Sequence, residues 1–462
     1  MLGVPELFAA GYGNVGSSIY YALGVVALVA VGATPIALSI AGLFFICTAL
    51  TYAEGTSMFP EAGGSASFAR HGFNELVGFI AGWALMLSYI VTISISAYTI
   101  SPYLGYFWEP LKESPVFGTL FSIGVVIFLM LINILGAKES GVINILATVI
   151  DLLTQLSLIV LGFILIFSVP VLVDNMFGND NWPGIGGLIF GIALASLAYT
   201  GVETISQMAE ETRLPHIRVP RALVYMMIAV VIIFSCISVI ALCAMTPQSL
   251  ATDWARDPVA GIADSLPFDW LRDVFEPLVG VLAATILLIA TNAGLMGISR
   301  LSFSMGLNRQ LPFVFTRIHH RFRTPYVSLI IFTVIAIAIL IPGMFTSGFF
   351  LDLGALYTFG SLLAFLLAHA AILSLRYRRP DLERPFRVGV NIGVMGREFP
   401  ITTVLGLLAT VVVWVVVLGE QPYARYVGFV WMVIGVISYS LYRRRANLPI
   451  IGKRESKGEP AN

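Results

Sequence analysis

The stretch GYGNVGSS, residues 11–18, interrupts the first long apolar segment of the chain and places three glycines within six positions. A second interruption, AYTGVE at residues 198–203, lies inside the sixth apolar segment. Each glycine in a helix interior costs about 1 kcal/mol relative to alanine, so a continuous helix gains nothing from this composition. Non-helical backbone is tolerated at membrane depth only where it lines a cavity or is buried in protein. Interruptions in corresponding places of two halves therefore point to a transporter's binding site.

The composition places the chain in a membrane. Of its 462 residues, 58% are hydrophobic and 11% are charged, whereas soluble proteins carry about 25% charged residues. A membrane helix needs about 20 apolar residues. We therefore expect an all-α integral membrane protein with about 12 transmembrane helices, near residues 2–31, 34–59, 74–108, 115–135, 140–172, 184–209, 219–246, 272–307, 325–342, 348–375, 400–419 and 423–442. The segments are uniformly apolar, whereas strands of a membrane β-barrel alternate, so a barrel is excluded.

The basic residues predict the orientation. If both chain ends lie on one side, 22 of the 26 Lys and Arg residues fall in the loops and tail of that side. The positive-inside rule then predicts a multi-pass protein of the plasma (inner) membrane with both termini in the cytoplasm. The final residues, 447–462, are polar and rich in Lys, Glu, Pro and Gly, which predicts a solvated, disordered cytoplasmic tail.

Short loop motifs follow one another in a defined order. They are YAE at 52–54, FPEAGGS at 59–65, GFIAGW at 78–83, AEET at 209–212, VPRA at 219–222, QLP at 310–312 and RTP at 323–325. Together with the two interrupted segments, this order resembles the amino acid–polyamine–organocation (APC) superfamily of permeases. The resemblance runs from Gly11 to about Arg376, and the last two segments fit it by number and hydropathy only.

The resemblance implies the leucine-transporter-type fold. Its expected parts are two inverted five-helix repeats (1–172 and 184–376), two additional transmembrane helices (400–442) and the cytoplasmic tail (447–462). In such proteins helices 1 and 6 are broken and substrate binds between them, midway through the membrane. A bundle of helices then moves against a scaffold to give alternating access.

The helix 1 interruption is similar to the element that cradles a substrate carboxylate in this superfamily. A helix N-terminus carries about half a positive charge and suits an anion. Gly13 and Gly16 would permit close approach of the substrate, and the hydroxyl of Ser17 or Ser18 would donate a hydrogen bond. The alternative is that these small residues only ease helix packing in the membrane.

The helix 6 interruption is expected to bind the substrate's ammonium group. Freed carbonyls at Leu197, Ala198 and Tyr199, beside Gly201, would accept its hydrogen bonds. The Tyr199 ring either covers the substrate or packs as an ordinary core aromatic. Leu197 stands where relatives that take cationic substrates can carry Trp, so it argues against a specialist for arginine or polyamines.

Two acids lie where acids are expensive, at a cost of at least about 2.5–3.5 kcal/mol near the bilayer centre. Glu203 is interpreted as a proton-sensing or gating residue, or as a structural acid that holds the break together. Asp151 stands where many members of the superfamily have Lys. It is a candidate proton carrier, a buried structural hydrogen-bonding group, or a sodium ligand together with Thr291 and Asn292.

The expected activity is secondary active transport of amino acids or closely related amines by proton-coupled symport. The alternatives are an exchanger, a sodium-coupled carrier, a polyamine or inorganic-cation carrier, and a sensor or channel. An enzyme is not expected, because the five histidines and three cysteines form no catalytic pattern and no phosphate-binding GxxxxGK[ST] motif occurs. We expect no cofactor beyond a coupling proton or sodium ion. The expected partners are substrate and lipid, with no nucleic acid, and the chain is expected to be a monomer or homodimer.

Overall fold

The structure is a computed structural model that describes residues 2–136, 141–178, 181–346, 348–394 and 397–452. Helices dominate it. Within the described residues the only strands are β1 (Asn391–Val394) and β2 (Arg397–Pro400), which pair antiparallel. Most of the predicted tail, residues 453–462, lies outside the described residues.

The long helices follow the predicted segments closely. In chain order they are α1 (Val4–Val15), η1 (Gly16–Ser18), α2 (Ile19–Ala30), α3 (Thr34–Met58), α5 (Glu75–Leu104), α7 (Pro115–Ile134), α8 (Gly141–Leu165), α10 (Gly184–Ala195), η3 (Ser196–Tyr199), α11 (Val202–Gln207), α12 (Pro215–Ala244), α15 (Asp269–Leu307), α16 (Tyr326–Leu340), α17 (Phe349–Arg378), α18 (Ile401–Glu420) and α19 (Pro422–Arg445).

Eleven helical stretches of the described chain are long and apolar enough to cross a membrane. The first of them, Val4–Met58, has 55 residues and joins the first two predicted segments. At about 1.5 Å per residue it is far longer than one crossing of about 30 Å. It turns at Val31, whose φ is 44°. The chain is thus an all-helical, multi-pass membrane protein, and its division into two inverted repeats stays a prediction.

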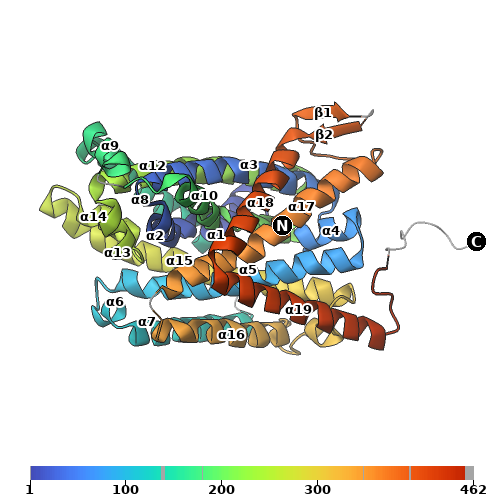
Figure 1. The fold of residues 1–462 in the computed structure, drawn as a ribbon. Helices are drawn as coiled ribbons and strands as arrows, with labels where there is room; N and C mark the ends of the chain where they lie inside the picture. Colours follow the sequence, from blue (N-terminus) through green and yellow to red (C-terminus); the bar gives the residue numbers. More distant parts are fainter. Residues whose placement is uncertain (1, 137–140, 179–180, 347, 395–396, 453–462) are drawn as a thin grey trace, which may run out of the picture.

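Short elements connect these helices at the two ends of the molecule. They are η2 (Val31–Ala33), α4 (Ser65–Gly72), α6 (Pro110–Glu113), α9 (Val169–Phe177), η4 (Ala209–Glu211), α13 (Pro247–Thr252), α14 (Pro258–Asp264), η5 (Phe313–Thr316) and η6 (Ile341–Met344). Figure 1 shows α6, α9, α13 and α14 at one end, and α4 with the β1–β2 hairpin at the other. The hairpin end carries many of the basic residues that predict the cytoplasmic side.

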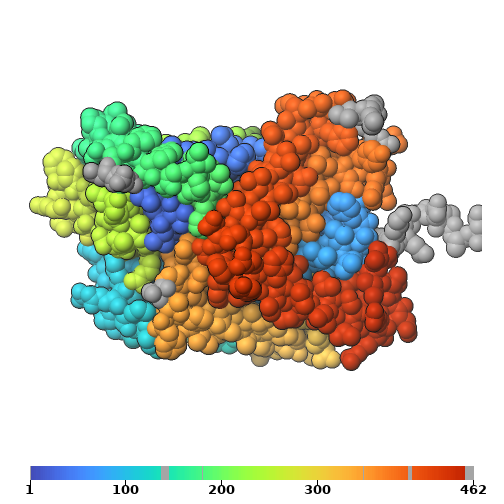
Figure 2. Space-filling view, in the orientation of Figure 1, coloured from blue at the N-terminus to red at the C-terminus, as the bar shows by residue number. Residues whose placement is uncertain are grey.

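The apolar surface of the bundle is suited to lipid. Large apolar side chains such as Phe128 on α7, Ile164 on α8, Leu408 on α18 and Val430 on α19 are all more than half exposed. Helices α18 and α19 form one outer face of the molecule (Figure 2). An apolar surface of this extent is not stable in water, so it marks the zone that contacts the membrane.

A loop at the hairpin end is held by charged groups. Glu61 accepts hydrogen bonds from Arg70 and Ser67, and His71 lies beside it. Burial alone would raise the pKa of Glu61, but the hydrogen bond from His71, the positive charge of Arg70 and the hydrogen bond from Ser67 lower it to about 2. Glu61 therefore stays ionised throughout the physiological pH range and ties α4 to the end of α3.

A buried ion pair at the same end joins distant parts of the chain. Arg376, at the end of α17, donates two hydrogen bonds to Glu54 of α3, at 2.7 and 2.6 Å. The backbone N–H of Val388 donates to the same carboxylate at 3.2 Å. The side chains of Glu54 and Arg376 are 0% and 3% exposed. This pair fastens the segment before β1 to the helix bundle.

Candidate functional site

The sixth membrane segment contains non-helical backbone. After η3, Thr200 is extended with ψ 152°, and Gly201 adopts φ 113° before α11 begins at Val202. A side chain is rarely tolerated at such a φ. A Cβ atom on Gly201 would also lie 2.8 Å from the Asn14 side chain of α1. Gly201 therefore allows the direction change and the close approach of the first and sixth segments.

We expect Gly201→Ala to destabilise the protein by about 1–3 kcal/mol, because the alanine must adopt a strained φ and displace Asn14. Thermal unfolding of the purified chain in detergent measures the change. Gly186→Ala is the matched control, since Gly186 lies on α10 with nothing within 4 Å of its Cβ position. Equal melting temperatures for the two variants would contradict the assignment.

The backbone of the first membrane segment stays helical at the predicted interruption. Residues Gly16–Ser18 form one 3₁₀ turn, and Gly16 keeps helical dihedrals of φ −63° and ψ −32°. The hydroxyl of Ser17 donates to the carbonyl of Asn14 at 2.9 Å, and that of Ser18 pairs with Tyr21 at 2.9 Å. The expected unwinding of this segment is therefore corrected, because its backbone stays helical and both hydroxyls have partners within the helix.

Gly16 of this turn and Gly13 of α1 both lie close to protein atoms. A Cβ atom on Gly16 would lie 2.6 Å from the ring of Tyr12, and one on Gly13 would lie 3.0 Å from Ile289 of α15. Gly16 thus makes room for the Tyr12 ring, and Gly13 allows α1 to approach α15. In this conformation Gly16 therefore borders the Tyr12 ring and no open space for a substrate.

Asp151 lies at the centre of a hydrogen-bonded cluster. Its side chain, on α8, is 1% exposed. It accepts hydrogen bonds from Tyr12 at 3.0 Å, Tyr20 at 2.6 Å and Gln155 at 2.7 Å. Tyr12 is on α1 and Tyr20 on α2, so one carboxylate bridges both sides of the Gly16–Ser18 turn. Among the described residues, no Lys or Arg forms an ion pair with Asp151.

The sequence interpretation missed the two tyrosines. Their spacing of eight residues across the turn puts both on one helix face, because eight residues are close to two helical turns. The signal is therefore a pair of polar aromatics at helical spacing in a segment that also contains the glycines. This signal predicts a site only when an acid in another membrane segment, here Asp151, is considered as the partner of the two tyrosines.

The proposed sodium ligands bond elsewhere. Thr291 donates to the carbonyl of Leu287 at 2.8 Å within α15. Asn292 accepts from the amide of Asn133 on α7 and contacts the sulfur of Met296 at 3.7 Å. The hydrogen bonds of these residues do not lead to Asp151. The described part of the chain also contains no group of three or more His, Cys, Asp or Glu residues arranged to hold a metal ion.

Glu203 contacts the non-helical backbone at Gly201, in the sixth membrane segment. Its carboxylate accepts the N–H of Gly201 at 3.1 Å, and the side chain is 1% exposed. One residue further on, Thr204 accepts a hydrogen bond from Asn14 at 2.7 Å. This geometry corresponds to the structural interpretation of Glu203, with a backbone N–H as the partner, and it ties α11 to α1.

Two of the predicted substrate contacts in the sixth membrane segment, the Tyr199 side chain and the Leu197 carbonyl, already have partners inside the protein. The hydroxyl of Tyr199 donates to the carbonyl of Leu38 at 2.8 Å, and its ring packs on Phe45 and Phe234. The carbonyl of Leu197 accepts the Thr200 hydroxyl at 2.8 Å. Tyr199 is therefore a packing aromatic in this conformation, and the Leu197 carbonyl is already bonded. Leu197 and Ala198 are fully buried.

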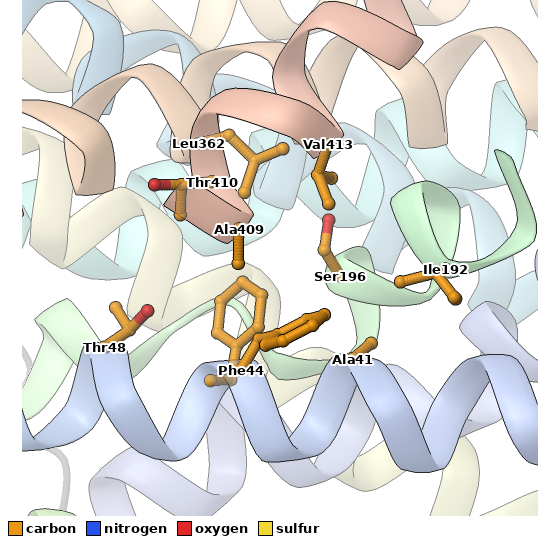
Figure 3. A pocket seen from close by; sticks show the side chains of 10 residues that line it. Ala41, Phe44, Thr48, Ile192, Ser196, Leu362, Ala409, Thr410 and Val413 are labelled. Carbon is orange, nitrogen blue, oxygen red and sulfur yellow. The ribbon is translucent and has the colours of Figure 1, made fainter. Parts of the chain in front are cut away.

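An apolar pocket lies between α3, α10, α17 and α18, and Ser196 of η3 is part of its lining (Figure 3). Its polar side chains all have partners. Ser196 donates to Ala193 at 2.6 Å, Thr410 donates to Gly406 at 2.7 Å, and Thr48 pairs with His369 at 3.2 Å. The pocket therefore offers no free polar group that could orient a charged ligand.

A more polar cavity lies between α1, α11 and α15. It is lined by Ala10, Thr204, Gln207, Met208, Ile289, Ala293, Met296, Gly297 and Arg300. Ala10 precedes the interruption of the first segment, and Thr204, Gln207 and Met208 follow the interruption of the sixth. Ala10 and Thr204 lie directly next to these interruptions, so this cavity adjoins both stretches that the sequence singles out.

The chain matches the amino acid permease family over residues 2–440. It is 28% identical to the branched-chain amino acid permease BcaP of Bacillus subtilis, over 96% of this chain and 93% of the relative. It is 25% identical to the methylthioribose transporter of the same organism, over 97% and 94%. It is also 27% identical to the vacuolar cationic amino acid transporter 4 of Arabidopsis thaliana, over 82% and 64%.

These relatives are transporters and permeases and not enzymes, which agrees with the prediction that the chain is not an enzyme. Their names cover several substrate classes, so they do not select one for this chain. The match nonetheless spans nearly every described membrane helix. The chain belongs to the amino acid permease family of the APC superfamily.

Proposed function

We propose that the protein is a secondary active transporter that carries amino acids into the cell together with protons. Family membership supports amino acids as the substrate. The observation that carries proton coupling is the buried carboxylate of Asp151, which the hydroxyls of Tyr12 and Tyr20 hold from both sides of the helix 1 turn. We place both termini in the cytoplasm and the protein in the plasma membrane, as the distribution of basic residues favours.

A charge buried without a cation is expensive, and binding a proton removes that cost. When Asp151 is ionised, both of its oxygens accept hydrogen bonds from tyrosines of α1 and α2. A protonated carboxyl must place a hydrogen on one oxygen, which weakens one of these bonds. Binding of a proton to Asp151 therefore changes how strongly this residue holds α1 and α2 together. Because Asn14 of α1 donates a hydrogen bond to Thr204, the change reaches α11 of the sixth membrane segment as well.

Purified protein in liposomes tests this function. Uptake of a panel of labelled amino acids is measured with an inward proton gradient and, separately, with an inward sodium gradient. We expect at least one amino acid to accumulate with the proton gradient, and we expect a protonophore to abolish the accumulation. Accumulation that persists after the proton gradient is collapsed, or that follows sodium alone, would overturn proton coupling. Absence of flux for every amino acid would overturn the substrate class.

Gly16→Ala tests the link between the turn and the coupling residue. The added methyl group would lie 2.6 Å from the Tyr12 ring and must displace it. Tyr12 then loses its bond to Asp151, so we expect the proton dependence of uptake to weaken at least fivefold. Gly124→Ala on α7 is the control, because nothing lies within 4 Å of its Cβ position. An unchanged pH profile in Gly16→Ala would separate Tyr12 from coupling.

A further inference from the structure

The cavity between α1, α11 and α15 contains a buried amide without a partner. The Gln207 side chain is 2% exposed, and among the described residues neither its oxygen nor its nitrogen has a hydrogen-bond partner. Leaving a buried polar group unpaired costs about 1–3 kcal/mol. Gln207 lines the cavity, so a ligand there can satisfy its acceptor and its donors together.

A second polar group lines the same cavity. Arg300 of α15 forms an ion pair with Glu211 of η4 at 2.8 Å, and the two side chains are 25% and 50% exposed. A ligand carboxylate can replace the exposed Glu211 and form charge-assisted hydrogen bonds with the guanidinium. Gln207 and Arg300 thus supply an acceptor and several donors, the set that a zwitterion with one ammonium and one carboxylate requires.

The rest of the lining is uncharged and mostly apolar. Besides Thr204 and Gly297, it consists of Ala10, Met208, Ile289, Ala293 and Met296. The described lining includes no Asp or Glu. A cationic side chain would therefore meet no acid among the lining residues, since Glu211, the half-exposed partner of Arg300, is not one of them. An anionic side chain would lie against apolar carbon. Methionine side chains adapt to apolar groups of different shapes.

We propose that this cavity binds amino acids with uncharged, apolar side chains on the path toward the cytoplasm. Gln207 accepts from the α-ammonium, Arg300 donates to the α-carboxylate, and Met296 and Ile289 contact the side chain. The inference rests on the proposed amino acid transport and adds the substrate class. The cavity measures about 50 Å³ in this conformation, which is room for a few water molecules. Substrate therefore enters only after α11 and α15 move apart.

Equilibrium binding of radiolabelled leucine to the full-length purified chain tests the site. We expect Gln207→Leu to weaken leucine binding at least tenfold, because it removes both polar atoms while keeping the volume similar. Its melting temperature should stay the same or rise, since it removes a buried unpaired amide, and this shows that the variant is folded. Gln248→Leu on α13 is the control for leucine binding with the same chemical change, because Gln248 is exposed, does not line the cavity and loses only its bond to Asn181.

Competition defines the class. We expect unlabelled isoleucine and methionine to displace labelled leucine, whereas a hundredfold excess of lysine or glutamate does not. Met296→Glu places an acid in the lining and should allow lysine to compete. A second variant thus tests the site by a gain of binding.

The outcomes separate the two proposals. If the wild-type chain transports leucine but Gln207→Leu binds it within twofold of wild type, the cavity holds water only and this inference falls. Displacement by lysine or glutamate as effective as that by isoleucine overturns the substrate class. A wild-type chain that transports no amino acid overturns the proposed function itself.

Discussion

Replacing Asp151 with asparagine is expected to abolish proton-driven accumulation of substrate, with a loss of at least tenfold, while exchange of substrate across the membrane continues. Asparagine has nearly the same shape as aspartate, and its amide oxygen can still accept from a tyrosine. It cannot bind and release a proton. Transport in Asp151→Asn therefore equilibrates substrate without concentrating it. Uptake of labelled substrate into proteoliposomes, with and without a proton gradient, measures accumulation. Counterflow of labelled substrate, with no proton gradient, measures exchange.

Asp174→Asn is the matched control for this experiment. Asp174 is exposed on α9 at the end of the molecule, so the same chemical change should leave accumulation unaltered. Tyr20→Phe should have an intermediate effect, because it removes one of three donors to Asp151. If Asp151→Asn accumulated substrate as well as the wild type, the proton would be carried by another group.

Replacing Arg376 with methionine is expected to cause the largest loss of stability, about 3–5 kcal/mol. The change leaves the carboxylate of Glu54 buried without its guanidinium partner. Arg384 lies 3.6 Å from the same carboxylate, so it compensates only in part. Thermal unfolding and the half-life of the purified protein in detergent measure the loss.

Two further variants isolate the cause. Arg379→Met removes an exposed arginine three residues away and should change the melting temperature little. A double variant, Glu54→Met with Arg376→Met, removes both charges and should recover much of the stability, because apolar replacement of a whole buried pair is often neutral. A single Arg376→Met variant that melted like Arg379→Met would show that the pair contributes no net stability.

The membrane helices could be predicted from the sequence because their signal is local. The 20-residue stretch Pro115–Ile134 of α7, for example, carries no charged residue and is apolar apart from Thr119, Ser122 and Asn133, and the prediction of 115–135 differs by one residue. Short elements such as α4 and the β1–β2 pair lie in polar connections with no periodic pattern, so they were not predicted. The family was recognisable because its motifs occur in a fixed order around these helices.

The candidate site was harder to predict, because it depends on contacts between distant residues. Asp151 attracts attention as an acid in an apolar segment, but its tyrosine partners lie 139 and 131 positions away. Tyr199 follows the pattern of a substrate-contacting aromatic, yet packing against α3 determines its position. Gln207 has an unremarkable sequence context. Only the fold shows that its amide is buried beside a cavity.

Direct measurement of proton movement tests the central claim, that amino acid and proton cross together through a step controlled by Asp151. Liposomes containing the wild-type protein and a trapped pH-sensitive dye are voltage-clamped with potassium and valinomycin, and leucine is added outside. We predict acidification of the lumen that depends on leucine and is absent in Asp151→Asn. Leucine uptake without acidification, or equal acidification in Asp151→Asn, would contradict the account.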